Sequence, residues 1–326
     1  MKEITILSTE IKPAGGMPFS SVENNDSFAH LCQIGEANGI YIVVTGFESY
    51  ESGVVSDAWV YETHGWNRTG RRPVEFIWDR CNISNKQRQK LNENKDIPVF
   101  NHFSLMALCR DKKANSDLSP ESVIPTETVN GSIDEIVDKI EKIRKMSLHP
   151  DLDPCKIVLK PRFEYSGRGI LGIKDENYEK LKGIENRDYV IQPFLETSTG
   201  IRELGIEGRH DLRIIVLNGR PLLSYARLAR QGHFISGVRY GAKVKYVKIA
   251  DIGSQFMDVV CSIDGKLNIF NPRMYSVDLG KGKERTWIFE LNGFPSVVWE
   301  PDDTRDIQNT KKMHERIIKT LAEYLQ

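Results

Sequence analysis

One segment near the middle of the chain restricts the fold more than any other. The run DLRIIVLNGRPLLSYARLA, residues 211–229, contains two alternating apolar stretches joined by Asn218 and Gly219. Asn-Gly between such stretches is the strongest short signal for a two-residue β-hairpin, because both residues accept the positive φ that the turn needs. An antiparallel hairpin is therefore predicted here, and the rest of the fold has to accommodate it.

The beginning of the chain follows a different pattern. Short β-branched runs occur at 3–7 and 40–45, and the residues between them, 27–38, have helical spacing that ends at Gly39. Further strands are predicted at 58–62, 74–79 and 97–101, and a charged helix at 85–95. Residues 1–100 are therefore predicted to form a small α/β domain.

The remainder of the chain has strands separated by a few helices. A helix is predicted from Phe103 through Lys112, and an amphipathic helix at 132–146 begins with a capping box of Ser132 and Glu135. Other strands are predicted at 156–161, 169–173, 188–195, 274–280 and 286–292, and other helices at 252–261 and from Asp306 onward. A chain of 326 residues exceeds one ordinary core, so two or more lobes are expected.

The balanced charge argues against nucleic acid and anionic membranes as partners, and the cysteines indicate the redox environment. Forty-five Lys and Arg balance forty-five Asp and Glu, so no global field attracts nucleic acid or an anionic membrane. The five cysteines are scattered, without a CxxC pair, which is typical of reduced thiols in a cytoplasmic protein. Neither a signal peptide nor a membrane span is predicted. A homodimer is one assembly to expect, because dimers are the commonest soluble oligomers.

Three oxygen-bearing side chains near the end of the sequence are the first candidates for chemistry. Glu290 and Asn292 are two residues apart on a predicted strand and therefore face the same side, and a hairpin can bring Asp278 beside them. Mg²⁺ prefers such oxygen ligands. Acidic residues also end ordinary surface strands, but the apolar neighbours Ile288 and Leu291 predict burial, where an unpaired carboxylate is costly. We interpret these residues as metal ligands.

A glycine-bearing segment, VLKPRFEYSGRGILGI, is the second candidate. Its Gly167, Gly169 and Gly172 match G-x-G-x-x-G, but a dinucleotide fingerprint has to open a helix, and here a strand continues. The glycines are expected in a loop between two strands, with Lys160 on the first. Such a loop beside a lysine suits a nucleoside triphosphate, although an ordinary Gly-rich hairpin has the same pattern.

A third group of charged residues lies on the central hairpin. Asp211 and Arg213 are two residues apart on one strand, and Arg227 follows on the next. They form either a structural ion pair or a ligand site in which Asp211 accepts from ribose hydroxyls and the arginines hold phosphate or carboxylate oxygens.

The order of these motifs resembles that of the ATP-grasp superfamily over roughly residues 101–326. The segments that carry the resemblance are RDKK, VLKP, YVIQPFL, HDLR, YSVDLG and IFELN. The resemblance implies a mixed α/β and α+β fold: an α/β pre-ATP-grasp domain at 1–100 and a two-lobed ATP-grasp fold of α+β lobes, with an N-terminal lobe at 101–190 and a C-terminal lobe at 191–326. ATP is the implied cofactor, with two Mg²⁺ ions and Mn²⁺ as their alternative.

The resemblance also assigns roles to individual residues. Metal ligands would be Asp278, Glu290 and Asn292. Nucleotide-binding residues would be Lys112, Lys160, Ser166, Gly167, Gly169, Gln192, Phe194, Leu195 and Asp211. Catalytic contacts to the transferred phosphoryl group would come from Arg213, Arg227 and Arg239.

Two departures narrow the subfamily. D-alanine-D-alanine ligases have an arginine two residues before the metal-binding aspartate, where this chain has Ser276, and a Pro-Gly pair after the metal asparagine, where it has Gly293 and Phe294. The chain is more similar to ligases that add glutamate to a ribosomal protein and to spore-coat ATP-grasp proteins.

The implied reaction is amide-bond formation between a small-molecule or peptide carboxylate and an amine, through an acyl phosphate. A carboxylate approaching a triphosphate is repelled by about 4 kcal/mol at about 4 Å and an effective dielectric of about 20, so bound cations are required. A kinase that phosphorylates a small molecule and a non-catalytic nucleotide-binding module are the alternatives. Substrate specificity is expected in the N-terminal domain, where charged and aromatic residues are conspicuous: Trp66, Arg71, Arg72, Trp78, Asp79 and Arg80.

Overall fold

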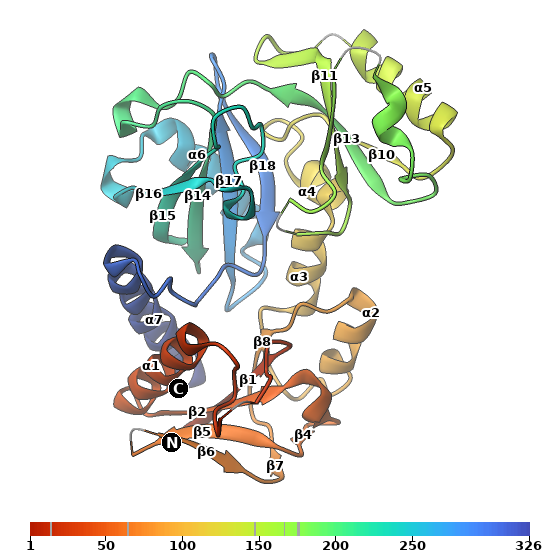
Figure 1. Cartoon of the computed structure of the whole chain (residues 1–326). Helices are drawn as coiled ribbons and strands as arrows, with labels where there is room; N and C mark the ends of the chain where they lie inside the picture. Colours follow the sequence, from red (N-terminus) through yellow and green to blue (C-terminus); the bar gives the residue numbers. More distant parts are fainter. Residues whose placement is uncertain (14, 64, 147, 166, 175–176) are drawn as a thin grey trace. The chain divides into compact units, whose positions relative to one another are not determined.

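The computed structural model describes residues 1–13, 15–63, 65–146, 148–165, 167–174 and 177–326 (Figure 1). These residues divide into two compact units. Unit 1 consists of Met1–Met106, Phe270–Met274 and Phe294–Gln326, and unit 2 of Ala107–Ile269 and Tyr275–Gly293. Residues 294–326 thus belong to unit 1, whereas the predicted range 191–326 grouped them with the residues that precede them. The predicted domain limits stay a proposal.

Unit 1 is built on a six-stranded sheet with the order β6-β5-β2-β1-β8-β9. The central strand β1 (Lys2–Ser8) is parallel to β2 (Ile40–Gly46) and β8 (Ile77–Arg80), and β8 is parallel to β9 (Val99–Phe100). The antiparallel strands β5 (Ala58–Glu62) and β6 (Gly65–Thr69) complete one side. The predicted strand, helix, strand opening is confirmed.

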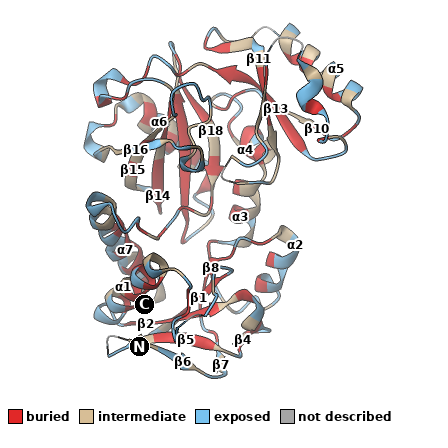
Figure 2. Ribbon diagram, in the orientation of Figure 1, coloured by how far each residue is buried: buried red, intermediate tan, exposed pale blue. Residues whose placement is uncertain are grey.

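Helices and a small second sheet accompany this large sheet. Helix α1 (Val22–Ala37) packs against α7 (Thr304–Leu325), which buries one face that includes Met313, Ile317 and Leu321. A separate core contains Leu7, Val43 and Ile77. Three short strands, β3 (Tyr50–Glu51), β4 (Val54–Val55) and β7 (Arg72–Pro73), form the second sheet. Figure 2 shows the continuous buried residues along β1 and β2.

Several predicted limits in unit 1 were wrong, and at the start of α1 a capping side chain explains the difference. Helix α1 starts five residues earlier than predicted, since the Ser21 hydroxyl accepts from the Asn24 amide at 3.3 Å. Helix α2 (Asn85–Arg88) and the 3₁₀ turn Gln89–Asn92 replace the longer charged helix. Strand β8 begins only at Ile77.

Unit 2 contains two sheets. The first has the order β10-β13-β11-β12, from β10 (Glu127–Val129), β13 (Tyr189–Leu195), β11 (Leu152–Pro161) and β12 (Leu171–Lys174). Helix α5 (Ile133–Lys145) covers one face, where its isoleucines meet Ile157, Leu159 and Ile191. The predicted capping box is confirmed, with the Ser132 amide donating to Glu135 at 2.7 Å.

The second sheet of unit 2 contains the predicted central hairpin. Its order is β16-β15-β14-β17-β18, from β16 (Lys243–Tyr246), β15 (Arg220–Leu228), β14 (His210–Leu217), β17 (Met274–Lys281) and β18 (Thr286–Asn292). Asn218 and Gly219 form the turn with φ of 44° and 78°, which confirms the Asn-Gly prediction. Helix α6 (Ser254–Leu267) accompanies this sheet.

The helix predicted from Phe103 through Lys112 is two helices. Helix α3 (Phe103–Arg110) ends before Asp111, and Asp111 caps α4 (Lys112–Leu118) by accepting from the Lys113 amide at 2.9 Å. Asp111 also accepts two hydrogen bonds from Arg162, at 2.6 and 2.7 Å, so a residue distant in sequence fixes this break.

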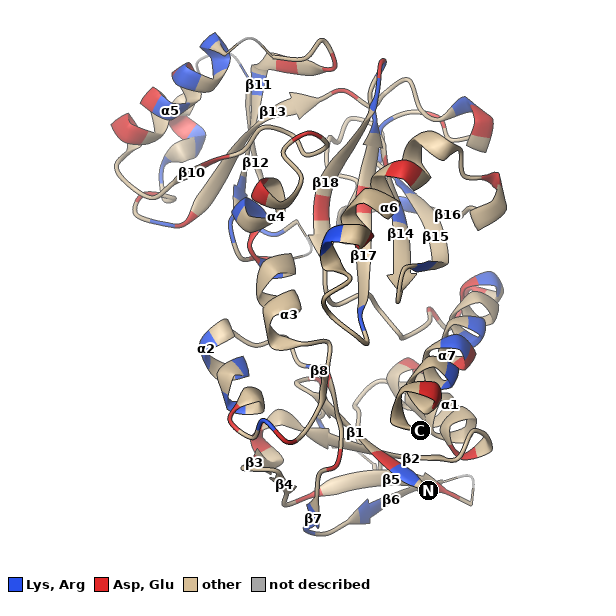
Figure 3. Ribbon diagram, turned by 180° about the vertical axis from the view of Figure 1, so that it is seen from behind, with Lys and Arg blue, Asp and Glu red and all other residues tan. Residues whose placement is uncertain are grey.

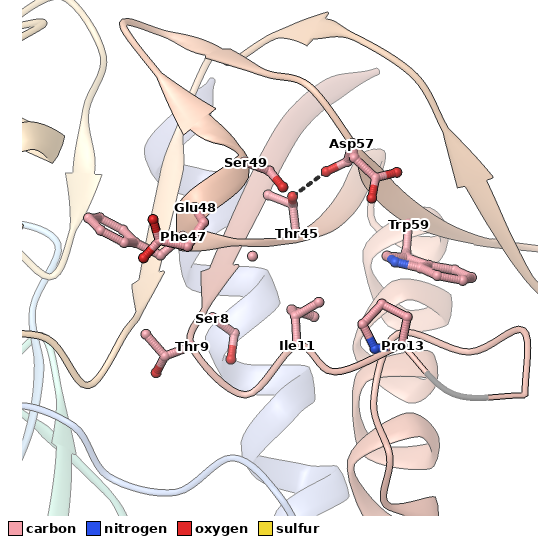
Figure 4. Close-up of a pocket in the computed structure, with 11 residues that line it drawn as sticks. Ser8, Thr9, Ile11, Pro13, Thr45, Phe47, Glu48, Ser49, Asp57 and Trp59 are labelled. Atoms are coloured by element: carbon pink, nitrogen blue, oxygen red, sulfur yellow. Dashed lines mark hydrogen bonds between the residues drawn. The ribbon is translucent and has the colours of Figure 1, made fainter.

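A cavity of about 290 Å³ lies in unit 1 where β1 and β2 end (Figure 4). The Thr45 hydroxyl donates to the backbone carbonyl of Asp57 at its edge. Polar and apolar residues line it together, among them Ser8, Thr45, Asp57, Ile11, Pro13 and Trp59. Among the described residues, no helix is long and apolar enough to cross a bilayer.

Candidate functional site

The hairpin of β17 and β18 brings the three predicted metal ligands together. Asp278 and Glu290 are paired in register, and Asn292 pairs with Ser276, two residues before Asp278. Asp278 is only 3% exposed, whereas Glu290 and Asn292 are half-buried. Glu290 and Asn292 are two residues apart on β18 and therefore lie on one face of the hairpin, as their spacing predicted.

Two arginines hold the carboxylate of Asp278. Arg213 on β14 donates from Nε and Nη2, both at 2.6 Å, and Arg227 on β15 donates from Nη2 at 2.7 Å. Burial by itself would raise the pKa of Asp278, but the two guanidinium groups outweigh it and lower the pKa to about 2. Asp278 is therefore an anion throughout the physiological pH range.

Asp211 joins the same network. Arg227 donates to its carboxylate from Nε at 2.7 Å and from Nη2 at 2.9 Å, and the Ser236 hydroxyl donates at 2.5 Å. Asp211 and Arg213 do not pair with each other: Asp211 pairs with Arg227 on β15, and Arg213 pairs with Asp278 on β17. Figure 3 shows the acidic segment on β17 beside basic segments on β14 and β15.

The donor set on the hairpin fits a hard cation. Two carboxylates and an amide supply only oxygen ligands, which is the chemistry that Mg²⁺ prefers. Asp278 already accepts from guanidinium groups, yet a carboxylate has about four lone-pair sites and can accept further. Within the part of the chain that the structure describes, no cluster of three or more His, Cys, Asp or Glu residues suits a metal ion, so the candidate set here is two carboxylates and the Asn292 amide.

Two lysines lie close to these acids. Lys160 is on the face of β11 opposite to the Leu159 core, and none of the described residues hydrogen-bonds to its ammonium group. Burial lowers the pKa of Lys160 to about 8; Glu290 opposes this shift, and Lys112 adds to it. Lys112, at the start of α4, is 8% exposed, and its Nζ donates to the carbonyl of Glu164 at 2.5 Å. The two cations therefore share one electrostatic environment.

The predicted glycine loop connects β11 and β12, which pair as antiparallel neighbours. Gly167 and Gly169 have φ of 69° and 70°, and a Cβ atom at Gly169 would lie 2.8 Å from Pro161. The Tyr240 hydroxyl donates to the Gly167 carbonyl at 2.9 Å. The strand that follows excludes a dinucleotide fingerprint, as predicted. Ser166 lies outside the described residues.

Strand β13 supplies the predicted adenine-facing residues. The Gln192 Nε2 atom donates to the Thr126 hydroxyl at 2.8 Å, whereas Gln192 Oε1 is buried without a partner among the described residues. A buried acceptor without a donor costs about 1–3 kcal/mol. Phe194 is buried next to the Phe234 ring, with centroids 6.3 Å apart, and Leu195 packs with Trp287. Gln192 therefore retains an unused acceptor.

Arg239 is placed differently from the other two predicted arginines. It lies in the 3₁₀ turn Val238–Tyr240, is exposed, and pairs with no described carboxylate. The structure thus brings Arg213 and Arg227 together and leaves Arg239 apart.

Sequence reasoning missed the residues that support this site from other segments. Ser236 and Tyr240 reach Asp211 and Gly167 over 25 and 73 residues, and Thr126 reaches Gln192 over 66 residues. Two of these residues, Ser236 and Tyr240, have a sequence signal, because they fall in the basic stretch RLARQGHFISGVRYGAK, which contains Arg239.

Comparison with solved structures supports the fold. D-cycloserine synthetase DcsG matches with a TM-score of 0.61 and 14% identity over 99% of this chain and 100% of that one. The Chryseobacterium gregarium RiPP-associated ATP-grasp ligase, solved with ADP and a leader and core peptide, matches with 0.61 and 13% over 100% and 96%. A RimK domain ATP-grasp protein from Sphaerobacter thermophilus matches with 0.59 and 14% over 97% and 99%.

Sequence comparison decides the family. No curated protein sequence matches the chain. The family profile described as RimK-like ATP-grasp domain matches residues 111–317, which is more than half of the chain and includes every predicted site residue. The mixed α/β and α+β fold predicted from the motif order is confirmed. The chain therefore belongs to the RimK-like ATP-grasp family.

Proposed function

We propose that this protein is an ATP- and Mg²⁺-dependent carboxylate–amine ligase. The observation that carries the proposal is the meeting of two lysines, Lys112 and Lys160, with the oxygen donors of the β17–β18 hairpin in a RimK-like ATP-grasp chain. The names of the structural relatives add support, because they include ligases and a synthetase.

ATP would use groups from both lobes of unit 2, two of which, Gln192 Oε1 and the Lys160 ammonium, have no hydrogen-bond partner among the described residues. The buried Oε1 of Gln192 would accept from the adenine amino group, and the backbone of Phe194 and Leu195 would border the base. Asp211 would accept from the ribose hydroxyls. Lys112, Lys160 and the loop of Ser166, Gly167 and Gly169 would contact the phosphates.

Local charge explains why divalent ions are needed. Lys112, Lys160, Arg213 and Arg227 are four cations against the carboxylates Asp211, Asp278 and Glu290, which leaves one excess positive charge. One charge does not neutralise a triphosphate. Two Mg²⁺ ions, or Mn²⁺, held by Asp278, Glu290 and Asn292 would supply the missing positive charge at the phosphate oxygens.

The proposed reaction has two steps. A substrate carboxylate oxygen bonds to the γ-phosphorus as the bond to ADP breaks, which gives an acyl phosphate. An amine nitrogen then bonds to the acyl carbon, phosphate leaves with the carbon–oxygen bond pair, and the amine loses a proton to solvent. Arg213 and Arg227 are held in place by Asp278 and Asp211 and would orient the transferred group; Arg239 would contact it from the loop.

The test is a substrate screen combined with one isosteric variant. Amino acids, short peptides and polyamines are supplied with ATP and Mg²⁺, phosphate release is measured, and products are identified by mass spectrometry. Glu290→Gln is expected to bind nucleotide within about threefold of wild type and to lose at least about 100-fold in turnover, of the order of one lost charge contact in a transition state.

The control is Glu284→Gln, which changes an exposed acid in the turn of the same hairpin. Its turnover is expected to stay within about twofold. Phosphate release that requires an amine supports the ligase, whereas a stable phosphorylated product identifies a kinase. Nucleotide binding with no product from any substrate pair would identify a binding module.

A further inference from the structure

Arg80 in unit 1 is a buried cation without a hydrogen-bond or ion-pair partner among the residues that the structure describes. It ends strand β8, is 6% exposed, and forms no hydrogen bond or ion pair with any described residue. Its Nε atom is fully buried and unpaired. The guanidinium stacks on Phe294, 4.0 Å from the ring centroid. Its two terminal nitrogens also lack partners among the described residues but, unlike Nε, are not fully buried.

A charge in this position is unfavourable unless something pairs with it. Burial lowers the pKa of Arg80 to about 10, which still leaves the guanidinium protonated at pH 7. Stacking on a ring compensates only part of the lost hydration. The charges of Glu10 and Asp79 favour the protonated guanidinium, but neither carboxylate of these described residues forms an ion pair with Arg80.

The neighbouring buried arginine shows how this fold treats a structural guanidinium. Arg88 is 2% exposed, yet it donates to Asp79 at 2.6 Å, to the Cys81 carbonyl at 2.5 Å and to the Ile83 carbonyl at 3.3 Å. Each side-chain nitrogen of Arg88 has an acceptor, whereas no described residue accepts a hydrogen bond from the side chain of Arg80. A purely structural role does not explain this difference.

Other arginines in the chain show which partner is missing. Five of them bind one carboxylate through the same edge, formed by Nε and Nη2: Arg68, Arg162, Arg209, Arg213 and Arg227. Arg80 has this edge without a carboxylate. Its terminal nitrogens can pair with an anion directly, and a small shift of neighbouring side chains would add Nε.

The position of Arg80 is one where α/β sheets bind ligands. Strand β1 lies between β2, which follows it through α1, and β8. The strands that come first after β1 are added on one side of it and the later strand β8 on the other side, so the boundary between β1 and β8 is a topological switch point. Ligands bind at the carboxyl ends of strands at such a point. Ser8, which pairs in register with Arg80, also lines the cavity in Figure 4, so a cavity lies at this edge of the sheet beside the strand next to Arg80, although Arg80 is not one of its lining residues.

We propose that Arg80, stacked on Phe294, binds the carboxylate group of a small ligand. The charge balance favours a monoanion, because Arg80 is a single cation and Glu10 and Asp79, whose negative charges act on it, oppose a second negative charge. A phosphate dianion would need more positive partners. The inference goes beyond the ligase proposal and does not rest on it, since unit 1 alone supplies these residues.

The test measures binding on the whole protein without nucleotide. The probe is sodium acetate, compared with sodium chloride and sodium phosphate at equal ionic strength. Arg80 Nε–H is followed in ¹H–¹⁵N spectra and assigned by its absence in Arg80→Met. Acetate is expected to shift this resonance with saturation, and chloride is not. Arg68→Met, which removes an exposed arginine of the same unit, is expected to leave the acetate response unchanged.

Thermal unfolding separates binding from a structural role. Arg80→Met is expected to keep or raise the Tm by a few degrees, because it removes a buried unpaired charge, and to lose the acetate response. Arg80→Lys keeps the charge but not the fork and should bind acetate at least about tenfold more weakly. A Tm loss of more than about 5 °C in Arg80→Met, an acetate response that survives it, or a response to phosphate alone would overturn the proposal.

Discussion

At the scale of single residues, the site separates cations that have partners from cations that are available to a ligand. Arg213 and Arg227 are each held through Nε and Nη2 by Asp278 and Asp211, so their geometry is fixed before any ligand binds. Lys160 has no hydrogen-bond partner among the described residues, and burial weakens its hydration. A ligand phosphate therefore gains most from Lys160 and costs the arginine network little reorganisation.

Adjacent lysines at the start of α4 allow a matched comparison. Lys112 is buried and shares the environment of Lys160, whereas Lys113 is more exposed and pairs with Asp117 at 2.6 Å. Lys112→Met is expected to weaken ATP binding about 10- to 100-fold, which corresponds to one charge-assisted hydrogen bond of about 1.5–3 kcal/mol. Lys113→Met should change affinity less than twofold. Equal effects in a calorimetric titration would contradict the assignment of Lys112.

His314 makes unit 1 sensitive to acid. Its Nε2 lies 2.7 Å from the Val297 carbonyl and its Nδ1 lies 3.0 Å from His30 Nδ1. Burial, with the positive charge of Arg80 and Lys311, lowers the pKa of His314 to about 3. The unfolded chain binds this proton near pH 6.5 and the folded chain does not, so stability is lost as pH falls below about 6.5.

The expected loss in the free energy of unfolding between pH 7.5 and pH 5 is about 2 kcal/mol, measured as lower protection factors of the α7 amides after correction for the intrinsic pH dependence of hydrogen exchange. His314→Gln should flatten this dependence, because glutamine can still donate to Val297 but does not titrate. His233→Gln, at an exposed histidine, should keep the wild-type slope. A slope that stays the same in His314→Gln would show that another group causes it.

At the scale of elements, the sequence predicts structure that depends on adjacent residues and misses structure that depends on residues far apart in the chain. Asn218 and Gly219 predicted their hairpin because the turn needs only its own two residues. The break between α3 and α4 was missed because Asp111 is fixed by Arg162, which is 51 residues away. In the same way, the two-residue spacing on a strand placed Glu290 and Asn292 on one face, but only the fold shows that Asp278 binds two arginines from other strands.

The glycine loop between β11 and β12 provides a test at this scale. Gly169 and Gly183 both have positive φ, but a Cβ atom would meet Pro161 at 2.8 Å in the first case and nothing within 4 Å in the second. Alanine at either position is strained by about 1 kcal/mol, and Gly169→Ala must also displace Pro161, which follows Lys160. We expect Gly169→Ala to weaken ATP binding about fivefold or more, since the loop moves.

Gly183→Ala is the control, and its ATP affinity should stay within about twofold of wild type. If the two variants bind ATP equally well while Gly169→Ala remains folded by circular dichroism, the loop conformation does not matter for the nucleotide.

At the scale of the whole molecule, the chain leaves unit 1 after Met106 and finally returns to it at Phe294. The terminal helix α7 therefore completes the core of the N-terminal unit, although residues 107–269 and 275–293 of unit 2 lie between them in sequence. The sequence predicted a helix from Asp306 onward, but no pattern in it showed that α1 would pack against this helix.

The assignment of α7 to unit 1 can be tested through its buried residues. Ile317 is fully buried in α7, so Ile317→Ala should destabilise unit 1 by about 2–5 kcal/mol through lost contacts and a cavity. Ile269→Ala changes an isoleucine that is 79% exposed in unit 2 and should cost less than about 0.5 kcal/mol. Hydrogen exchange read separately for each unit measures both variants. Faster exchange is expected in β1, β2 and α1 of Ile317→Ala, while β14 and β17 keep their protection; an opposite pattern would place α7 with unit 2.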